Sequence, residues 1–446
     1  MKKTIFLILF IAFALSACVP KTPSKDAIVI STEAPETLPA EMTAVAPTNT
    51  LVPTLTPSMT PTPLPESISD SVFFFNWLIE FANANNGTVT VGGQELNALQ
   101  LLDEIQNNSE NFIETRLING EEVEFLLVNG IPLAFRNESG QWQEATIKNL
   151  GTMVNLKMGS LISNDEGLRS WWGSEYHMGT VTLGLSDDMK DKTTIDFGWP
   201  RYQAEIAREN LLETKFHAVL FPGDAPSWVY DGFTQEELDN LVRMVVKFAK
   251  SQQMDEIVVV NEARTPASWV NHDMYWEKLG IEYVISAFTI AREVYPEAKL
   301  IYNDTANHKE GTYATETTHL ISNALFERGL IDYVGVQMHV ESNQYPNKDE
   351  MISVFRSYPV PVVITEFDVL LTDVPKDKRD ETLNEVTRTV IEGCIESEVC
   401  LSITWWGEND RVGWTGRSLL RDMNNKRKQA YYVAMQTMFE YLPSAY

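Results

Sequence analysis

The stretches VVVNEA (residues 258–263) and VITEFD (residues 363–368) share one pattern, in which an apolar run rich in β-branched residues ends at a glutamate. A short apolar run of this kind is typical of a strand that is buried on both faces in a parallel sheet. The two glutamates, Glu262 and Glu366, therefore stand where a buried strand meets a loop. The segments around them decide how those strands are arranged.

From about residue 153 onward, apolar strand patterns alternate with amphipathic helical patterns. The expected strands are Val154–Ile162, Gly179–Leu183, His217–Phe221, Ile257–Val260, Lys299–Asn303, Tyr333–Gln337, Val360–Thr365 and Leu401–Trp406. Helices are expected between several of them, as over Gln235–Ser251, Glu282–Val294 and Asp380–Ile395. Eight such units over roughly 290 residues favour the α/β class and a (β/α)₈ TIM barrel over an open doubly wound sheet. No glycine-rich phosphate loop follows the first strand, which argues against a dinucleotide-binding fold.

Polar residues stand at the ends of the expected strands, where a (β/α)₈ barrel carries its chemistry. A single glutamate at such a place is equally well explained by exposure to solvent. Two glutamates on the fourth and seventh strands lie across the barrel from each other and can face each other over a cleft. Two facing carboxyl groups suit glycoside hydrolysis, in which one donates a proton and the other attacks the anomeric carbon.

Residues from about 153 to 440 resemble glycoside hydrolase family 10, the endo-β-1,4-xylanases, as a divergent member. The resemblance is carried, in chain order, by VNEA (260–263), AKLIYND (298–304), GVQMH (335–339), ITEFD (364–368) and the eighth-loop residues Trp406, Gly407, Asp410 and Trp414. Each motif alone is weak, and it is their shared order and spacing that identifies the family.

The resemblance implies a retaining endo-β-1,4-glycanase that acts on xylan or a related plant β-glycan. Glu262 would be the general acid/base and Glu366 the nucleophile. His339, oriented by Asp368, would bond Glu366 and favour its charged form. The residues implied to contact or support the substrate are Asn261, His217, Trp228, Asn303, Gln337, Trp406 and Trp414. The resemblance implies no cofactor and no metal ion.

The chain departs from the family at the sugar-binding positions on the non-reducing side. The stretch HAVLFPGDAPSW (217–228) keeps His217 and Trp228, but Pro222 and Asp224 replace a second His and a Gln. The second strand lacks the family's Glu-Asn and Lys-Trp pairs. These losses leave open an alternative function, a catalytically impaired, surface-tethered glycan-binding protein on the same barrel. A further alternative keeps hydrolysis and changes the sugar.

The first 66 residues predict export and tethering. Lys2 and Lys3 precede a short apolar run that ends in Leu15-Ser16-Ala17-Cys18, so residues 1–18 resemble a lipoprotein signal with a bacterial lipobox and Cys18 as the lipidated residue. An ordinary cleaved signal with a chance cysteine is the alternative. Residues 19–66 hold ten of the 21 prolines and ten threonines, which predicts a disordered, extended linker. We expect a lipid-anchored protein on the extracellular or periplasmic side of the cell envelope.

Residues 67–150 predict a small α+β unit of unknown role ahead of the barrel, residues 151–446. Helical patterns cover Val72–Phe81 and Asn97–Ile105, and the strands Val123–Val128 and Ile131–Phe135 flank an Asn-Gly turn. A cap packed on the barrel is one interpretation, and a separate module that binds sugar or protein is the other.

Net charge and cysteine content limit the classes of molecule that the protein is expected to bind. Lys+Arg number 35 and Asp+Glu 62, and the net charge of −27 disfavours nucleic acid. Three cysteines are too few for a disulfide-built scaffold and lack the paired spacing of a zinc module. The family resemblance implies a disulfide between Cys394 and Cys400, which export permits, and two buried free thiols are the alternative. The expected partners are a β-linked polysaccharide and the membrane, with the protein as a monomer.

Overall fold

The computed structural model describes residues 72–136, 140, 142–163, 172–264, 274–341, 347–413, 415 and 417–445. The predicted signal segment with Cys18, the linker and Trp414 lie outside the described residues. No helix in these ranges is both long enough and apolar enough to cross a membrane.

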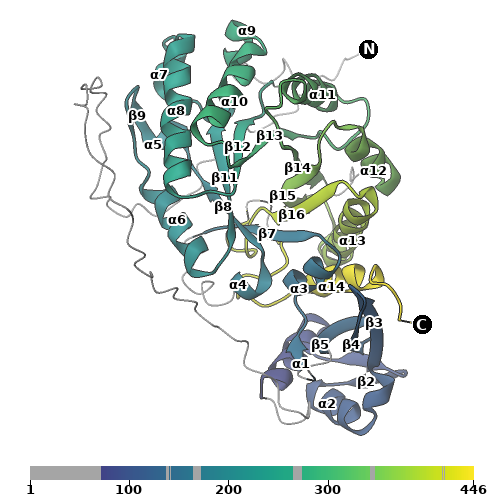
Figure 1. The fold of residues 1–446 in the computed structure, drawn as a ribbon. Helices are drawn as coiled ribbons and strands as arrows, with labels where there is room; N and C mark the ends of the chain where they lie inside the picture. The colour runs from purple at the N-terminus through teal and green to yellow at the C-terminus, as the bar shows by residue number, and fades with distance from the viewer. Residues whose placement is uncertain are drawn as a thin grey trace, which may run out of the picture.

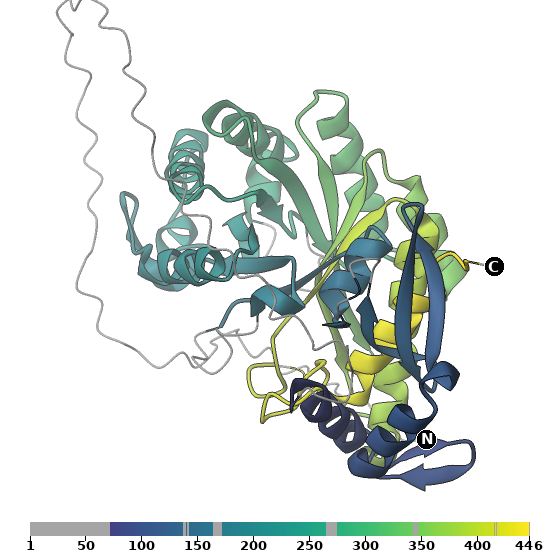
Figure 2. The same ribbon diagram turned by 60° about the horizontal axis from the view of Figure 1, so that its bottom comes forward.

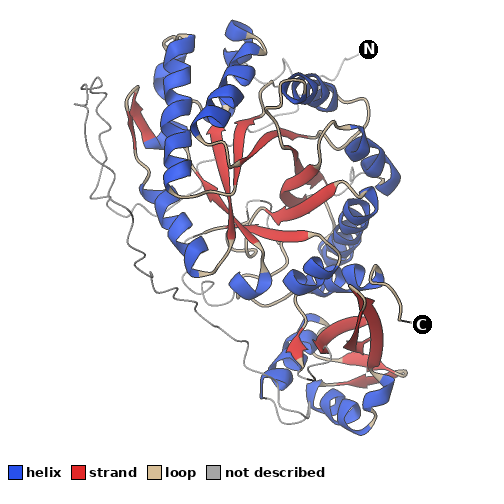
Figure 3. Cartoon of the chain, viewed as in Figure 1, coloured by secondary structure: helices blue, strands red, loops and turns tan. Residues whose placement is uncertain are grey.

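Eight parallel strands close into a barrel at the centre of the molecule, with helices around it (Figures 1 and 3). The strands are β7 (Lys157–Leu161), β8 (Met178–Thr182), β11 (Glu213–Leu220), β12 (Glu256–Asn261), β13 (Lys299–Thr305), β14 (Tyr333–Glu341), β15 (Val362–Leu370) and β16 (Cys400–Trp405). β16 pairs with β7 and closes the ring. The (β/α)₈ prediction is confirmed, and each of the eight expected strands is present.

Helices of varied length follow the strands. They are α4 (Trp172–Glu175), α5 (Leu185–Asp188), α6 (Gly198–Glu209), α7 (Ser227–Tyr230), α8 (Gln235–Ser251), α9 (Met274–Leu279), α10 (Glu282–Val294), α11 (Tyr313–Phe326), α12 (Lys348–Ser357), α13 (Arg379–Ser397) and α14 (Gln429–Glu440), with the 3₁₀ turns η4 (Pro222–Asp224) and η5 (Lys376–Lys378). In α8, Leu238, Leu241, Val242, Val245 and Val246 are buried, so one apolar stripe packs on the barrel. Its first turn is fixed by a capping box between Thr234 and Glu237.

The residues before the barrel form a unit of helices and two antiparallel sheets, one of two strands and one of four, at the lower right of Figure 1. Its elements are α1 (Val72–Ala84), β1 (Val89–Val91), β2 (Gln94–Leu96), α2 (Ala98–Asn107), η2 (Ser109–Asn111), β3 (Ile113–Ile118), β4 (Glu121–Val128), β5 (Ile131–Arg136), β6 (Gln143–Glu144) and α3 (Ile147–Met153). Asn129 and Gly130 have φ of 54° and 77°, as a tight turn between β4 and β5 requires. The predicted α+β unit is confirmed, and β3 is a strand that the sequence analysis did not expect.

This N-terminal unit packs against α14, as the cap interpretation expected, and Figure 2 shows the two side by side. Phe125 of β4 meets Phe439 of α14 edge to face, with ring centroids 5.0 Å apart. Arg116 of β3 donates from Nη1 to the carbonyl of Leu442 at 3.0 Å and lies over the Phe439 ring. The unit and the barrel therefore share one apolar core.

A buried ionic cluster joins the same two parts. Glu175 accepts hydrogen bonds from Arg421 Nη2 at 2.9 Å, from Arg427 Nη2 at 2.5 Å and from the Tyr431 hydroxyl. Arg427 also pairs with Glu144 of the N-terminal unit at 2.5 Å. Burial raises the pKa of Glu175, but the two arginines outweigh it and leave that pKa below its ordinary value. The carboxylate is therefore charged and fully paired.

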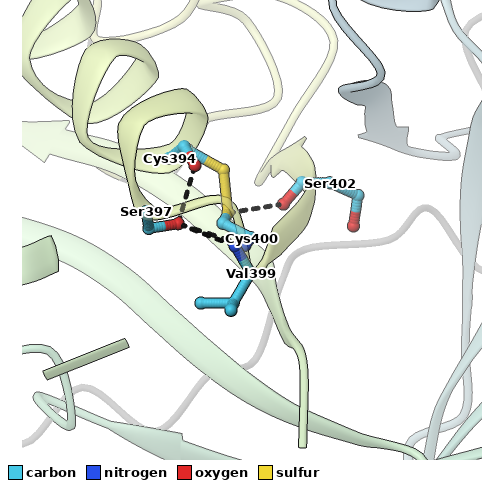
Figure 4. Close-up of a disulfide and its surroundings, with 5 residues drawn as sticks. All are labelled: Cys394, Ser397, Val399, Cys400 and Ser402. Atoms are coloured by element: carbon cyan, nitrogen blue, oxygen red, sulfur yellow. Dashed lines mark hydrogen bonds between the residues drawn. A yellow bond between two sulfur atoms is a disulfide. The ribbon is translucent and has the colours of Figure 1, made fainter. Parts of the chain in front are cut away.

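Cys394 and Cys400 form a disulfide that links the end of α13 to the start of β16 (Figure 4). Ser397, between them, donates to the Cys394 carbonyl at 2.7 Å and accepts from the backbone N–H of Cys400 at 3.1 Å. The disulfide that the resemblance implied is present, and the free-thiol alternative is wrong.

Candidate active site

Strand pairing brings the polar strand-end residues together at one end of the barrel. Asn261 of β12 is the register partner of Asn303 of β13. On the other side, Gln337 and His339 of β14 are the partners of Glu366 and Asp368 of β15. Because β12, β13, β14 and β15 are consecutive neighbours in the barrel, these side chains form one continuous group.

Three side-chain amides connect the two glutamates. Gln337 Nε2 donates to Glu262 Oε1 at 2.9 Å and to Asn261 Oδ1 at 3.0 Å. Asn303 Nδ2 donates to the same Asn261 oxygen at 2.7 Å and to Glu366 Oε1 at 2.8 Å. Each amide nitrogen thus serves two acceptors, and an unbroken path runs from Glu262 to Glu366.

The hydroxyl of Thr365 fixes the orientation of the Asn303 amide, which is the amide next to Glu366 on this path. Thr365 donates from Oγ1 to Asn303 Oδ1 at 2.6 Å, which turns the amide nitrogen of Asn303 toward Glu366. Gly335 makes room for this amide, since a Cβ at that position would lie 2.4 Å from Asn303 Oδ1. The sequence analysis missed both residues. The signal for Thr365 was a polar residue inside an otherwise apolar run.

Glu366 lies in a pocket of nitrogen donors. His339 Nε2 is 3.1 Å from Glu366 Oε2, and His339 Nδ1 is 2.9 Å from Asp368 Oδ1. His217 Nδ1 lies 3.7 Å from Glu366 Oε1. Burial raises the pKa of Glu366, but the two imidazoles and the Asn303 amide outweigh it and hold that pKa below its ordinary value.

The imidazole of His339 is cationic over the range in which carboxyl groups titrate. Burial lowers the pKa of His339, yet Asp368 and Glu366 more than offset it and raise the pKa to about 10. Asp368 itself is buried at the end of β15, next to this imidazole. The arrangement fixes a positive charge beside Glu366.

Glu262 has the opposite environment. Burial raises its pKa to about 7, and the charge of Glu366 adds to the effect while the Gln337 amide opposes it. Its backbone has φ of 48°, and its N–H donates to the carbonyl of Asn303 at 2.9 Å. A non-glycine residue in the left-handed region is uncommon and is concentrated at functional sites. At a pH below about 7 and above the lowered pKa of Glu366, the site therefore contains one protonated and one ionised carboxyl group.

The aromatic candidates lie in different surroundings. Trp406 is partly exposed, and its ring meets His217 edge to face at 5.2 Å and His339 at 6.3 Å. Trp228 is only 9% exposed, and Lys192 Nζ lies over its ring at 5.2 Å. The structure thus brings Trp406 next to the two histidines that lie beside Glu366, while a lysine lies against the ring of Trp228.

The Lys192 contact comes from a hairpin that the sequence analysis did not expect. A two-stranded hairpin, β9 (Met189–Asp191) and β10 (Thr194–Ile195), follows α5, and Lys192 at its tip pairs with Glu237 at 2.5 Å. Asp224 accepts from the backbone N–H groups of Leu185 at 2.6 Å and Ser186 at 3.2 Å. Asp224 therefore holds the first turn of α5 in place.

No set of three or more His, Cys, Asp or Glu side chains in the described ranges is arranged to hold a metal ion. The buried Lys215 is a further residue that the sequence analysis missed, because β11 begins at Glu213, four residues before the strand expected from His217. Lys215 is fully buried inside the barrel, where Nζ donates to Thr404 Oγ1 at 3.2 Å and lies 3.6 Å from Glu256. Its contacts are with the barrel interior.

The chain is similar in sequence to known proteins. Residues 177–437 match the family described as Glycosyl hydrolase family 10. An Endo-1,4-beta-xylanase A from Caldicellulosiruptor saccharolyticus is 31% identical over 262 residues, which are 51% of this chain and 76% of that protein. An Endo-1,4-beta-xylanase from Agaricus bisporus is 27% identical over 273 residues, 58% of this chain and 78% of that protein.

Solved structures share the fold. The xylanase 10B from Thermotoga petrophila RKU-1 in complex with xylobiose has a TM-score of 0.61 and 23% identity, and the match covers 67% of this chain and 98% of that one. The native xylanase 10B from Thermotoga maritima has a TM-score of 0.60, also at 23% identity, covering 66% and 98%.

Proposed function

Because the chain belongs to glycosyl hydrolase family 10 and is a glycoside hydrolase, we propose that it is a retaining endo-β-1,4-glycanase with xylan or a related β-1,4-linked plant glycan as its substrate. The observation that carries this proposal is the pair of opposite pKa shifts. The pKa of Glu262 is raised to about 7, and the pKa of Glu366 is lowered. Two carboxyl groups held in different protonation states are what an acid and a nucleophile need.

In the first step, a carboxylate oxygen of Glu366 attacks the anomeric carbon of the sugar. The glycosidic C–O bond breaks, and Glu262 gives its proton to the leaving oxygen. The products are a shortened glycan and a covalent glycosyl-enzyme ester on Glu366. The cationic His339, 3.1 Å from Glu366 Oε2, keeps the nucleophile ionised before attack.

In the second step, Glu262 takes a proton from a water molecule while the water oxygen attacks the anomeric carbon. The ester C–O bond breaks, and Glu366 leaves as a carboxylate. Formation of the ester removes the negative charge of Glu366, which is one of the causes that raise the pKa of Glu262. The pKa of Glu262 therefore falls in the intermediate, and the former acid becomes a base. The same residue can serve both steps because the charge of its neighbour changes between them.

We assign the sugar contacts to the side chains that border the two glutamates. The Asn261 oxygen already accepts from Asn303 and Gln337, and its amide nitrogen makes only a long hydrogen bond of 3.5 Å to Glu262 Oε1, so a second N–H can donate toward a sugar hydroxyl. Trp406 offers a partly exposed ring beside His217 and His339. Asn303 and Gln337 support the carboxyl groups. Xylan is the favoured substrate because the relatives compared here are named as xylanases and one solved neighbour holds xylobiose.

The test is release of reducing sugar from a panel of soluble β-glycans by the chain from Ser24 to Tyr446. The panel contains arabinoxylan, glucuronoxylan, mixed-linkage glucan and glucomannan. We expect turnover on a xylan, loss of turnover in Glu366→Ala, and retention in Glu341→Ala, an exposed glutamate at the end of β14. Absence of turnover on every polymer, with binding preserved in affinity electrophoresis, would overturn the enzyme proposal in favour of a tethered glycan-binding barrel.

We also propose that the protein is exported and anchored through Cys18. The Cys394–Cys400 disulfide supports export, because disulfides persist in oxidising compartments. In a bacterial host, the full chain should partition into the detergent phase of a Triton X-114 extract, and Cys18→Ser should move it to the aqueous phase. Aqueous partitioning of the unaltered chain would contradict the anchor.

A further inference from the structure

Arg264 stands two residues after Glu262, on the loop that leaves β12. Its guanidinium carbon lies 5.2 Å from the ring centroid of Trp276 in α9 and 4.9 Å from that of Tyr313 at the start of α11. Both distances are within the range of attraction between a cation and an aromatic ring. Two rings from two different helices therefore hold the guanidinium group in place.

Within the described part of the chain, no carboxylate lies within ion-pair distance of Arg264, and the side chain makes no hydrogen bond. Other basic groups of the barrel have acidic partners. Lys192 pairs with Glu237 at 2.5 Å and Lys428 pairs with Asp410 at 3.0 Å. In a chain with 62 acidic and 35 basic residues, a cation that two rings hold and that has no acidic partner among the described residues is unusual.

The backbone around Arg264 is also fixed relative to the acid/base candidate. Ala263 is fully buried, and its carbonyl accepts a hydrogen bond from the Tyr283 hydroxyl at 2.8 Å. Two residues of extended chain span at most about 7 Å, so Arg264 begins close to Glu262. Glu262 gives its proton to the leaving oxygen, so the sugar on the leaving-group side lies next to it. The backbone of Arg264 therefore begins next to the leaving-group side of the cleft.

We propose that Arg264 is a specificity-determining residue that binds the carboxylate of a uronic acid side group carried by the glycan on the leaving-group side of the scissile bond. This inference rests on the proposed hydrolase function. A guanidinium group presents paired N–H donors that match a carboxylate, and stacking on rings fixes its plane without using those donors. The net charge of −27 repels an acidic side group, so a local cation is needed to bind one beside the active site.

The test compares two substrates that differ only in the acidic group: a neutral xylo-oligosaccharide and the same oligosaccharide with one glucuronic acid substituent. The expected result for Arg264→Gln is a loss of kcat/KM of about 10–100-fold on the acidic substrate and less than about 2-fold on the neutral one. The kcat/KM of Arg264→Lys on the acidic substrate should lie between those of the unaltered enzyme and Arg264→Gln, because lysine keeps the charge and loses the paired donors. The preference of the unaltered enzyme for the acidic substrate should weaken as salt increases.

Arg243→Gln is the matched control, because Arg243 is a surface residue of α8 that pairs with Glu293. Equal losses on both substrates in Arg264→Gln would show a purely structural role and overturn the inference. Binding of both oligosaccharides to Glu366→Ala, with and without Arg264→Gln, is measured by calorimetry and needs no turnover. If the unaltered enzyme hydrolyses neither substrate, the proposed function fails, while this binding comparison still decides the role of Arg264.

Discussion

Glu262 and Glu366 belong to one hydrogen-bond network, yet their pKa values move in opposite directions. Gln337 donates to Glu262 and Asn303 donates to Glu366, and both amides meet at Asn261 Oδ1. Burial raises the pKa of both carboxyl groups. The difference arises because the imidazoles of His217 and His339 favour the charge of Glu366, whereas Glu262 has Glu366 itself as its charged neighbour.

The pH profile of kcat/KM should be bell-shaped. Activity requires protonated Glu262, so it should fall as the pH rises through about 7, and it requires ionised Glu366, so it should fall at acidic pH below the ordinary glutamate range. Gln337→Met removes a hydrogen bond that lowers the pKa of Glu262 and should move the alkaline limb to higher pH. The measurement is kcat/KM on a xylo-oligosaccharide from pH 3 to 10. An alkaline limb that Gln337→Met leaves in place would contradict this account.

Neutralising the nucleophile candidate should change the titration of its neighbour. In Glu366→Gln, the negative charge that raises the pKa of Glu262 is gone, so the Glu262 pKa should fall from about 7. The pKa can be followed by NMR of glutamates labelled at the carboxyl carbon. Glu341→Gln, at an exposed position, should leave the Glu262 titration unchanged. An unchanged or higher Glu262 pKa in Glu366→Gln would refute the coupling between the two carboxyl groups.

Asp368→Asn should impair the enzyme without unfolding it. Asp368 is a principal cause of the high pKa of His339, so its loss should lower that pKa and withdraw positive charge from Glu366. Loss of an outer residue that orients a catalytic group commonly costs 10–100-fold in activity. We expect a decrease in kcat of about that size and a shift of the acidic limb to higher pH. A decrease in kcat with an unmoved acidic limb would indicate a packing role instead.

Glu175→Gln should destabilise the fold. It leaves the buried Arg421 and Arg427 without their shared carboxylate, and breaking a buried ion pair costs about 3–5 kcal/mol. The free energy of unfolding is measured in urea at pH 7. The matched control is Glu381→Gln, which removes an exposed pair with Lys378 and should match the unaltered protein.

The same cluster predicts a dependence of stability on pH. Because the pKa of Glu175 is lower in the folded than in the unfolded chain, its stabilisation is complete above the unfolded pKa of about 4.3. That stabilisation is lost as the pH falls through the lower, folded pKa. The difference in free energy of unfolding between the unaltered protein and Glu175→Gln should therefore shrink in acid. A difference in free energy of unfolding that stays constant from pH 7 to pH 3 would contradict a lowered pKa of Glu175 in the folded protein.

The barrel and the polar group at its mouth followed from the sequence because each depends on local pattern. A run such as VVVNEA shows a buried strand and its polar end in one window, and the alternation of strands with helices fixes their parallel pairing. The register that joins Gln337 to Glu366 and Asn261 to Asn303 then follows from the closure of the barrel.

Features that depend on contacts between residues far apart in the chain could not be predicted from the sequence. Asp224 appeared to be a replaced sugar contact, but its carboxylate holds the first turn of α5, 38 and 39 residues away in sequence. Trp228 stays a predicted substrate contact, but the packing of Lys192, from an unexpected hairpin, against its ring was not expected. Neither contact has a local signature, because short irregular strands and capping carboxylates take their partners from the tertiary fold.

The hydroxyl of Thr365 has a consequence for the energetics of the reaction. By donating to Asn303 Oδ1, it forbids rotation of the first amide, and each later amide is then locked by the one before it. The dipoles around the two glutamates consequently have little freedom to reorient when negative charge moves from Glu366 to Glu262 in the first step. In water, solvent dipoles must reorganise to follow such a charge, and the fixed amides avoid that cost. Thr365→Val would keep the shape of the side chain and restore the orientational freedom of the whole path.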